Sequence, residues 1–190
     1  MSTVRVRPFE VDDVPAAGEL LAARHRRHRM ALPLLAARYE DVDAATAEVA
    51  VALATAHASG AVAVRDGQTV GFLLGAPKPG EVWGPNVWVE AAGQAVVEAE
   101  TIRDLYAVAA TRWVDEGRTA HYVLVPATEA ELVHAWFRLG FGHQHTHGLR
   151  AVPADASAPA GRVTVRRATR DDIPALARLI ARATAALTVR

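Results

Sequence analysis

The amino-acid sequence predicts an α/β (α+β) fold, and three observations carry this prediction. Segments of alternating polarity, such as Val4–Phe9, are typical of half-buried strands. They come between segments whose apolar residues recur at helical spacing, such as Ala99–Gly117. The pair Asp66-Gly67 stands between two strand-like runs and is the strongest short-range signal for a β-hairpin.

The composition excludes several classes of protein. The chain has 190 residues, with 21 Lys and Arg against 21 Asp and Glu, so it has no net charge to attract nucleic acid or an anionic membrane. It contains no cysteine, so disulfides and thiolate metal sites are excluded. No apolar run reaches the ~18 residues of a membrane span, and the N-terminus lacks the pattern of a secretory signal. We therefore expect a cytoplasmic protein with no nucleic-acid or membrane partner.

The first expected elements are a strand at Val4–Phe9 and a helix after it. Asp12 or Asp13 can cap this helix, and Pro15 suits its first turn. The helix runs into Arg24–Arg29, which holds four arginines and two histidines. Positive charge suits the C-terminal end of a helix dipole, so we interpret this run as a solvated helix end. A phosphate-binding role is the alternative.

The middle of the chain is expected to hold a second helix and three strands. Leu32–Ala58 has helical character throughout. Ala61–Arg65 and Thr69–Gly75 form the two strands of the expected hairpin. Asn86–Val97 is interpreted as one further strand.

The third part of the chain is expected to continue with helix, strand and helix. A helix is predicted at Ala99–Gly117 and a strand at Ala120–Val125. Thr128 and Glu131 have the spacing of a capping box, in which each side chain bonds the backbone amide of the other residue. They would start a helix that ends at Gly140.

A last strand, expected at Phe141–Val152, contains three histidines in alternation. On a strand His143, His145 and His147 point to one face. Histidines at this spacing can share a zinc ion, with His121 as a conceivable further ligand. We predict no metal, because no carboxylate or cysteine in the strand completes a ligand set. The favoured interpretation is a polar strand face lining a ligand cleft.

The beginning of the chain recurs near its end. With an offset of 159, Val4–Ala22 aligns with Val163–Ala181 at nine identical positions of nineteen. This spacing is typical of a duplicated domain rather than of a short solenoid repeat. We predict a domain at 1–152, a Pro/Ala/Ser/Gly linker at 153–162 and the first strand and helix of a second copy at 163–190. The alternative is two unrelated strand–helix starts that share capping chemistry.

Two stretches carry a resemblance to a known family. "VRVRPFEVDDVPAAGELL" at the start and "AHYVLVPATEAELVHAWFRLGFGHQ" later resemble parts of the GNAT N-acetyltransferase superfamily, in the same order of elements. The whole chain resembles the degenerate first domain of actinobacterial tandem-GNAT proteins, followed by the start of a second copy. The resemblance implies a mixed, mostly antiparallel central sheet with helices on both faces. It also implies acetyl-CoA as cofactor and a small-molecule or protein amine as acceptor.

The family's cofactor loop is not visible in this sequence. In the family, glycines and a basic residue before a helix leave backbone amides free for the acetyl-CoA pyrophosphate. The corresponding positions here are Val97, Glu100 and Ile102 or, in the register shifted by one, Val96, Ala99 and Thr101. Neither set contains glycine or a basic residue, and Glu98, Glu100 and Asp104 add negative charge. A like charge at ~4 Å near a protein surface costs on the order of 4 kcal/mol. We therefore expect the first domain to be impaired in cofactor binding.

The resemblance also places the remaining site residues. Glu90 is the candidate catalytic base, and the backbone of Val89 and Ala91 is the candidate contact for the pantetheine arm. Trp88 shares a strand face with Glu90 and is a candidate for the ligand cleft, as are His121, Trp136 and the three alternating histidines. The alternative for Glu90 is a solvated edge glutamate.

Two positions depart from the family pattern. The family's general acid is a tyrosine, and its position holds Trp136, whose indole N–H donates a hydrogen bond but is no useful acid. A frequent asparagine corresponds to Glu129.

Three functions remain open at this point. The first is acetyl transfer from acetyl-CoA to an amine. The second is a non-catalytic ligand-binding or domain-pairing module. The third is a homodimerisation module built from the partial second copy.

Overall fold

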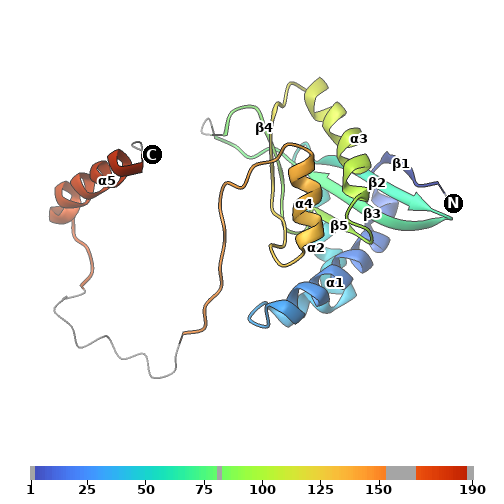
Figure 1. Ribbon diagram of the computed structural model, residues 1–190, viewed down its shortest axis with the longest axis horizontal. Coiled ribbons are helices and arrows are strands. Elements are labelled where there is room, and N and C mark those ends of the chain that lie inside the picture. Colours follow the sequence, from blue (N-terminus) through green and yellow to red (C-terminus); the bar gives the residue numbers. More distant parts are fainter. Residues whose placement is uncertain (1–2, 81–82, 153–165, 188–190) are drawn as a thin grey trace. The chain divides into compact units, whose positions relative to one another are not determined.

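The computed structural model describes residues 3–80, 83–152 and 166–187 (Figure 1). The chain divides into two compact units, Met1–Arg150 and Ala151–Arg190. In the described ranges, every helix is too short or too polar to cross a membrane.

An ion pair ties the first strand of the chain to the helix that follows. Arg7 donates two hydrogen bonds to the carboxylate of Asp13, at 2.7 and 2.6 Å. The same carboxylate accepts the backbone amide of Glu10 at 2.9 Å. These bonds close a turn from which the helix starts. Asp13 stands at the N-cap of α1, but its side chain does not cap the helix as predicted, because its carboxylate is bonded to Arg7 and to the Glu10 amide. The elements are β1 (Arg5–Pro8), the 3₁₀ turn η1 (Val11–Asp13) and α1 (Val14–Ala31).

The predicted helix over Leu32–Ala58 is wrong at both ends. A 3₁₀ turn η2 (Ala37–Glu40) comes first, and helix α2 covers Val42–Ala54. The carboxylate of Asp41 accepts the amide of Ala44 at 2.9 Å and so caps a new helix. The local cap therefore overrides the continuous helical pattern of the sequence.

The predicted hairpin is confirmed. Strands β2 (Ser59–Arg65) and β3 (Gln68–Gly75) pair antiparallel. Asp66 and Gly67 both have positive φ, 51° and 79°, which is what a type I′ turn requires.

The predicted strand over Asn86–Val97 is two strands that belong to two sheets. Strand β5 (Gln94–Val96) is the last strand of an antiparallel sheet with the order β1-β2-β3-β5. Strand β4 (Asn86–Val89) pairs in parallel with β6 (Ala120–Val123). An isolated antiparallel bridge also joins β4 to the chain just after β3. The sheet therefore splits between β5 and β6.

Helices cover both faces of the sheet, so the predicted fold class is confirmed. Leu73 lies on the face that packs against α3 (Thr101–Asp115) and α4 (Ala130–Arg138). Phe72 and Leu74 alternate with it and pack against α1 and α2 on the opposite face.

The structure corrects two predictions near the end of the first unit. Residue Glu129, not Thr128, precedes the first turn of α4, and no side chain caps this helix. The Glu129 carboxylate lies instead beside Arg27, at 3.7 Å. Residues 141–152 form no strand. There His143 bonds locally to the carbonyl of His145 and to Thr146, at 3.1 and 2.8 Å.

The described part of the second unit repeats the bonds that start the first. Arg166 donates to the carboxylate of Asp172 at 2.8 and 2.7 Å, and the Thr169 amide donates to it at 2.7 Å. The elements are the 3₁₀ turn η4 (Arg170–Asp172) and helix α5 (Ile173–Leu187). Each bonded residue is 159 positions after its counterpart, so the sequence repeat is also a repeat of local structure. The predicted linker, and the strand expected to precede this turn, lie largely outside the described residues.

The two aligned segments differ in burial. Val14 and Ala17 of α1 lie in the core, whereas the aligned Ile173 and Leu176 of α5 are 58% and 46% exposed. Taken by itself, the described part of the second unit thus has apolar side chains on α5 that its own described residues do not bury.

Candidate functional site

The break between β4 and β5 is built around a close contact of backbones. A Cβ atom on Gly93 would lie 2.4 Å from the carbonyl oxygen of Leu74, so only glycine fits there. The Gly93 amide donates to the backbone carbonyl of Glu90 at 2.8 Å, and the Gly93 carbonyl accepts the Leu74 amide at 2.6 Å. The four residues from Glu90 to Gly93 therefore form a turn while the chain stays paired to β3. This turn carries the candidate base and starts the split of the sheet.

Arg24 reaches this turn from helix α1. Its side chain is 5% exposed, and its guanidinium donates to the carbonyls of Ala91, at 2.6 Å, and Gln94. Burial lowers the pKa of Arg24 to about 10, and the charge of Glu129 opposes that shift. The side chain therefore stays charged near neutral pH. The interpretation of Arg24–Arg29 as a solvated helix end is wrong for Arg24, which is buried. The composition of this run does not distinguish Arg24 from the neighbouring arginines.

A second buried polar contact crosses the gap between the two sheets. Gln94 is 1% exposed, and its side-chain amide donates to the carbonyl of Leu124 at 2.6 Å. Its side-chain oxygen accepts the indole N–H of Trp136 at 3.1 Å. Trp136, predicted for the ligand cleft, is thus a buried residue that holds Gln94 in place. Sequence reasoning did not identify Gln94, because no local pattern marks it.

The carbonyls proposed as cofactor contacts already have partners inside the chain. The carbonyl of Val89 accepts the amide of Leu124 at 2.9 Å. The carbonyl of Ala91 accepts Arg24. Both candidate residues therefore lie where the sheet splits, as expected, with their carbonyls engaged.

The backbone amides at the start of α3 are engaged as well. Those of Thr101, Ile102 and Arg103 donate to the three preceding carbonyls at 3.0, 3.2 and 3.0 Å. Glu98 pairs with Arg65 at 2.8 Å, and Glu100 pairs with Arg138. This end of α3 therefore carries paired carboxylates, and the first three amides of the helix are engaged.

A hollow of 420 Å³ lies beside this end of α3. One wall holds Glu129, of which one carboxylate oxygen faces Arg27. The other oxygen is buried and has no hydrogen-bond partner among the described residues. The lining residues are Arg27, Val96, Val97, Ala99, Glu129, Ala130, Glu131 and Leu132.

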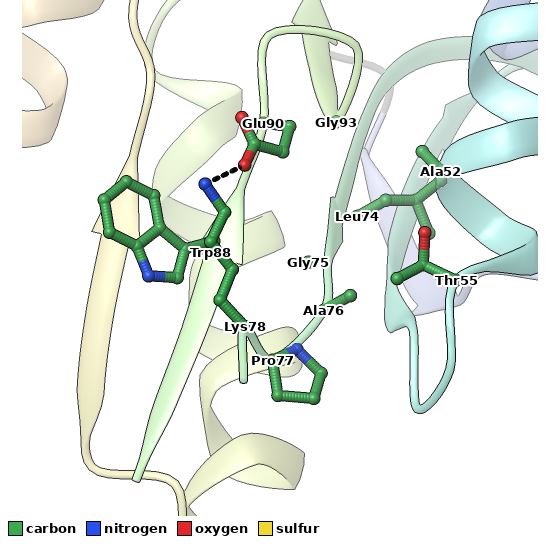
Figure 2. A pocket seen from close by; sticks show the side chains of 10 residues that line it. All are labelled: Ala52, Thr55, Leu74, Gly75, Ala76, Pro77, Lys78, Trp88, Glu90 and Gly93. Carbon is green, nitrogen blue, oxygen red and sulfur yellow. Dashed lines mark ion pairs between the residues drawn. The ribbon is translucent and has the colours of Figure 1, made fainter. Parts of the chain in front are cut away.

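A second hollow, of 230 Å³, is lined in part by Glu90 and Gly93 of the turn (Figure 2). Glu90 and Lys78 form an ion pair in it, and both side chains are about half-exposed. Most of its lining is apolar and comes from the end of α2, from β3 and from β4. Glu90 and Trp88 therefore line the same hollow, although Glu90 follows β4 in the turn and does not lie on the strand face that was expected to carry both.

The four candidate histidines do not join this site. His121 lies on β6 opposite Val87, so it faces away from Trp88. Both of its ring nitrogens are in hydrogen bonds, with the Tyr106 hydroxyl at 2.7 Å and the Arg118 carbonyl at 2.9 Å. The predicted common strand face of the other three is wrong, because those histidines are exposed and lie on no strand. Over the described ranges, no three His, Cys, Asp or Glu side chains are grouped to hold a metal.

Comparison with solved structures identifies the fold. No protein-family model matches the sequence, and no curated protein matches it significantly. An aminoglycoside N-acetyltransferase in complex with CoA superposes with a TM-score of 0.56 at 16% identity, over 80% of this chain and 96% of its own. The ribosomal-protein-alanine N-acetyltransferase of Brucella melitensis biovar Abortus gives 0.55 at 15%, over 79% and 100%. A GCN5-related N-acetyltransferase from Ralstonia eutropha gives 0.57 at 14%, over 78% and 99%. The first unit therefore has the fold of the GNAT N-acetyltransferases.

Proposed function

We propose that the first unit is an acetyltransferase-type domain that binds an amine but is impaired in holding acetyl-CoA. The amine belongs to a small molecule or a protein. The fold supports the relation to N-acetyltransferases, two of whose solved members act, by their names, on aminoglycosides and on the alanine of a ribosomal protein. The impairment is inferred from the residues that occupy the place of the cofactor.

The observation that carries this proposal is the position of Arg24. In the GNAT fold the split between strands exposes backbone to the pantetheine arm of the cofactor. Here the Arg24 guanidinium donates hydrogen bonds to the Ala91 and Gln94 carbonyls at the split. The side chain of Gln94 crosses the split and donates to the Leu124 carbonyl. A hydrogen bond from a charged group contributes about 1.5–3 kcal/mol, and Arg24 makes two of them, so a cofactor arm is not expected to displace it.

The diphosphate end of acetyl-CoA does not fit the start of α3 either. A diphosphate needs free backbone amides at a helix N-terminus. The first three amides of α3 are already bonded, and Glu98 and Glu100 stand just before them. The residues present therefore do not fit acetyl-CoA, and we derive no acetyl-transfer step through it.

A second candidate function is acetyl transfer itself, with Glu90 as the base that accepts the amine proton. The CoA complex of a structural neighbour favours it, as does the position of Glu90 in a hollow beside the split. This function requires that Arg24 and Gln94 move aside when cofactor enters.

We also infer that the segment from Arg166 to Leu187 begins a second copy of the domain. The repeated ion pair and turn support this inference. Pairing with a further GNAT-type domain, or with a second chain, would cover its apolar helix face.

Calorimetric titration with acetyl-CoA tests the main proposal. We expect no binding heat at millimolar cofactor, since both anchoring regions are occupied. An active GNAT enzyme titrated in the same buffer is the control. Micromolar binding by this chain would contradict the impairment and favour the second candidate.

A further inference from the structure

The indole of Trp88 carries a cation on its face. The ammonium nitrogen of Lys78 lies 4.0 Å from the centre of the Trp88 ring system and is also paired with the Glu90 carboxylate. An aromatic face and a carboxylate together are a recognised arrangement for binding an organic ammonium ion. In Figure 2 the lysine side chain runs along the hollow toward Glu90, next to the indole.

We propose that this hollow is an alkylammonium-binding site that Lys78 itself occupies, and that an external amine binds by displacing Lys78. This inference rests on the proposed function, because it names the chemical class of the amine ligand and what regulates its binding. The further element is that Lys78, a residue of the chain itself, competes with the external amine.

The indole face is fixed before any ligand arrives. Tyr122 stacks on Trp88 with ring centres 4.6 Å apart and planes 14° apart. Trp83 packs edge-on against both rings, at 5.0 and 5.4 Å. The ring is therefore held from its other sides, and little ordering is needed when a cation binds.

The rest of the hollow suits an aliphatic chain. Ala76, Pro77 and Ala52 contribute apolar surface, and Thr55 is a polar group at the edge. The stem of Lys78 runs beside the Trp88 indole toward Glu90 (Figure 2). A primary amine with a short unbranched alkyl chain reproduces both the charge and the stem of the lysine.

Lys78 is held loosely enough to be displaced. Its side chain is 41% exposed and that of Glu90 is 47% exposed, and ion pairs this exposed are weak. If Lys78 occupies the site about nine-tenths of the time, the apparent affinity for a competing amine falls about tenfold. Removing the charge of Lys78 should therefore raise the apparent affinity for the amine by the same factor.

The first experiment measures amine binding by NMR, from the indole N–H signals of the tryptophans. Pentylammonium is the probe, and pentan-1-ol is the uncharged control. We expect Lys78→Met to bind pentylammonium about tenfold more tightly than the unmodified chain, with the largest shift at the Trp88 signal. Arg112→Met is the matched control, because it removes an exposed cation that is paired with Glu116 elsewhere; its affinity should be unchanged.

A second substitution tests the carboxylate. Adding Glu90→Gln to Lys78→Met removes the counter-charge at nearly constant shape, and we expect the gained affinity to be lost. Equal binding of pentanol and pentylammonium, or no gain in Lys78→Met over Arg112→Met, would overturn the proposal.

A third measurement needs no substitution and so does not depend on a variant that folds. Lys78 is the sole lysine of the sequence, so reductive methylation with ¹³C-formaldehyde labels it and the N-terminal amine. We expect a dimethyl-lysine signal shifted by the indole ring current, which moves toward its unstructured position as pentylammonium is added. Binding of the probe without this movement would contradict displacement. Acetyl-CoA titration reports separately on the proposed impairment, so either idea can fail alone.

Discussion

Asp13 and Asp172 occupy equivalent positions and share the bonds from an arginine and a backbone amide, and Asp172 also accepts the Thr169 hydroxyl at 3.2 Å. Burial raises the pKa of Asp13, but the bonds from Arg7 and from the Glu10 amide outweigh it, and the pKa is lowered. The bonds from Arg166 and Thr169 lower the pKa of Asp172, whose side chain is 24% exposed against 7% for that of Asp13. An acid whose folded pKa is lowered stabilises the fold above its unfolded pKa, and this contribution is lost as the pH falls through the folded value.

Asp13→Asn should therefore lower the free energy of unfolding at pH 7 by about 2 kcal/mol, the scale of a hydrogen bond to a charged group. It should also flatten the loss of stability below about pH 4, the unfolded pKa of aspartate. Urea unfolding from pH 7 to pH 2 measures both effects. Asp172→Asn is the control, and we expect it to leave the transition of the first unit unchanged. Equal losses in the two variants would contradict this account.

The buried groups at the split show what single residues reveal before a structure is known. Glu90, Val89 and Trp88 could be placed together because they are neighbours in sequence. Arg24 could not be separated from the other arginines of its run, because its burial depends on carbonyls almost seventy residues away. Gln94 carries no local signal at all, since its partners belong to the segments around β6 and α4.

At the scale of elements, α1 and α2 pack so closely that a side chain is excluded between them. A Cβ atom on Gly18 would lie 2.0 Å from the Thr46 hydroxyl oxygen and 2.7 Å from the Thr46 Cα. The hydroxyl can rotate away, but the Cα belongs to the backbone of α2. This contact requires glycine despite the lower helix propensity of that residue.

Gly18→Ala should destabilise the first unit by about 1–3 kcal/mol, the usual cost of overpacking. Thermal and urea unfolding measure the change. Thr46→Ala in the same chain should restore only part of the stability, since the conflict with the Cα remains. Gly142→Ala, at an exposed position with open space around its Cα, is the control and should be neutral. Full recovery in the double variant would show that the hydroxyl alone causes the conflict.

Elements with local signals were predicted well. The hairpin depended on Asp66-Gly67, and the start of α1 depended on its aspartates, so both could be located. The division of Asn86–Val97 depends on the contact of Gly93 with Leu74, which no periodicity reports. The strand expected at residues 141–152 alternates in sequence but pairs with no strand of the described residues.

At the scale of the whole molecule, the repeat raises the question of whether α5 can replace α1 in a second copy of the chain. The aligned positions argue against such an exchange. Leu176 corresponds to the buried Ala17, and Ala177 corresponds to Gly18, where a Cβ meets Thr46. The apolar face of α5 is therefore suited to another surface than the one α1 covers.

We expect the unmodified chain not to form exchanged dimers when it is refolded at high concentration. The double substitution Leu176→Ala, Ala177→Gly removes both steric differences, and exchanged dimers should form in this variant. Size-exclusion chromatography with light scattering measures the mass of each species. Equal dimer formation by the unmodified chain would show that the helix interface tolerates the larger residues.

The bond between Arg7 and Asp13 has a consequence for the order of folding. It closes a loop of six residues, for which the entropy cost is small. Val6, by contrast, pairs with Ala63 on β2, so β1 can pair only after the chain has been synthesised as far as β2. We expect this turn to be an early nucleus, and its counterpart at Arg166 to form at the same pace, because contacts between near neighbours are made first.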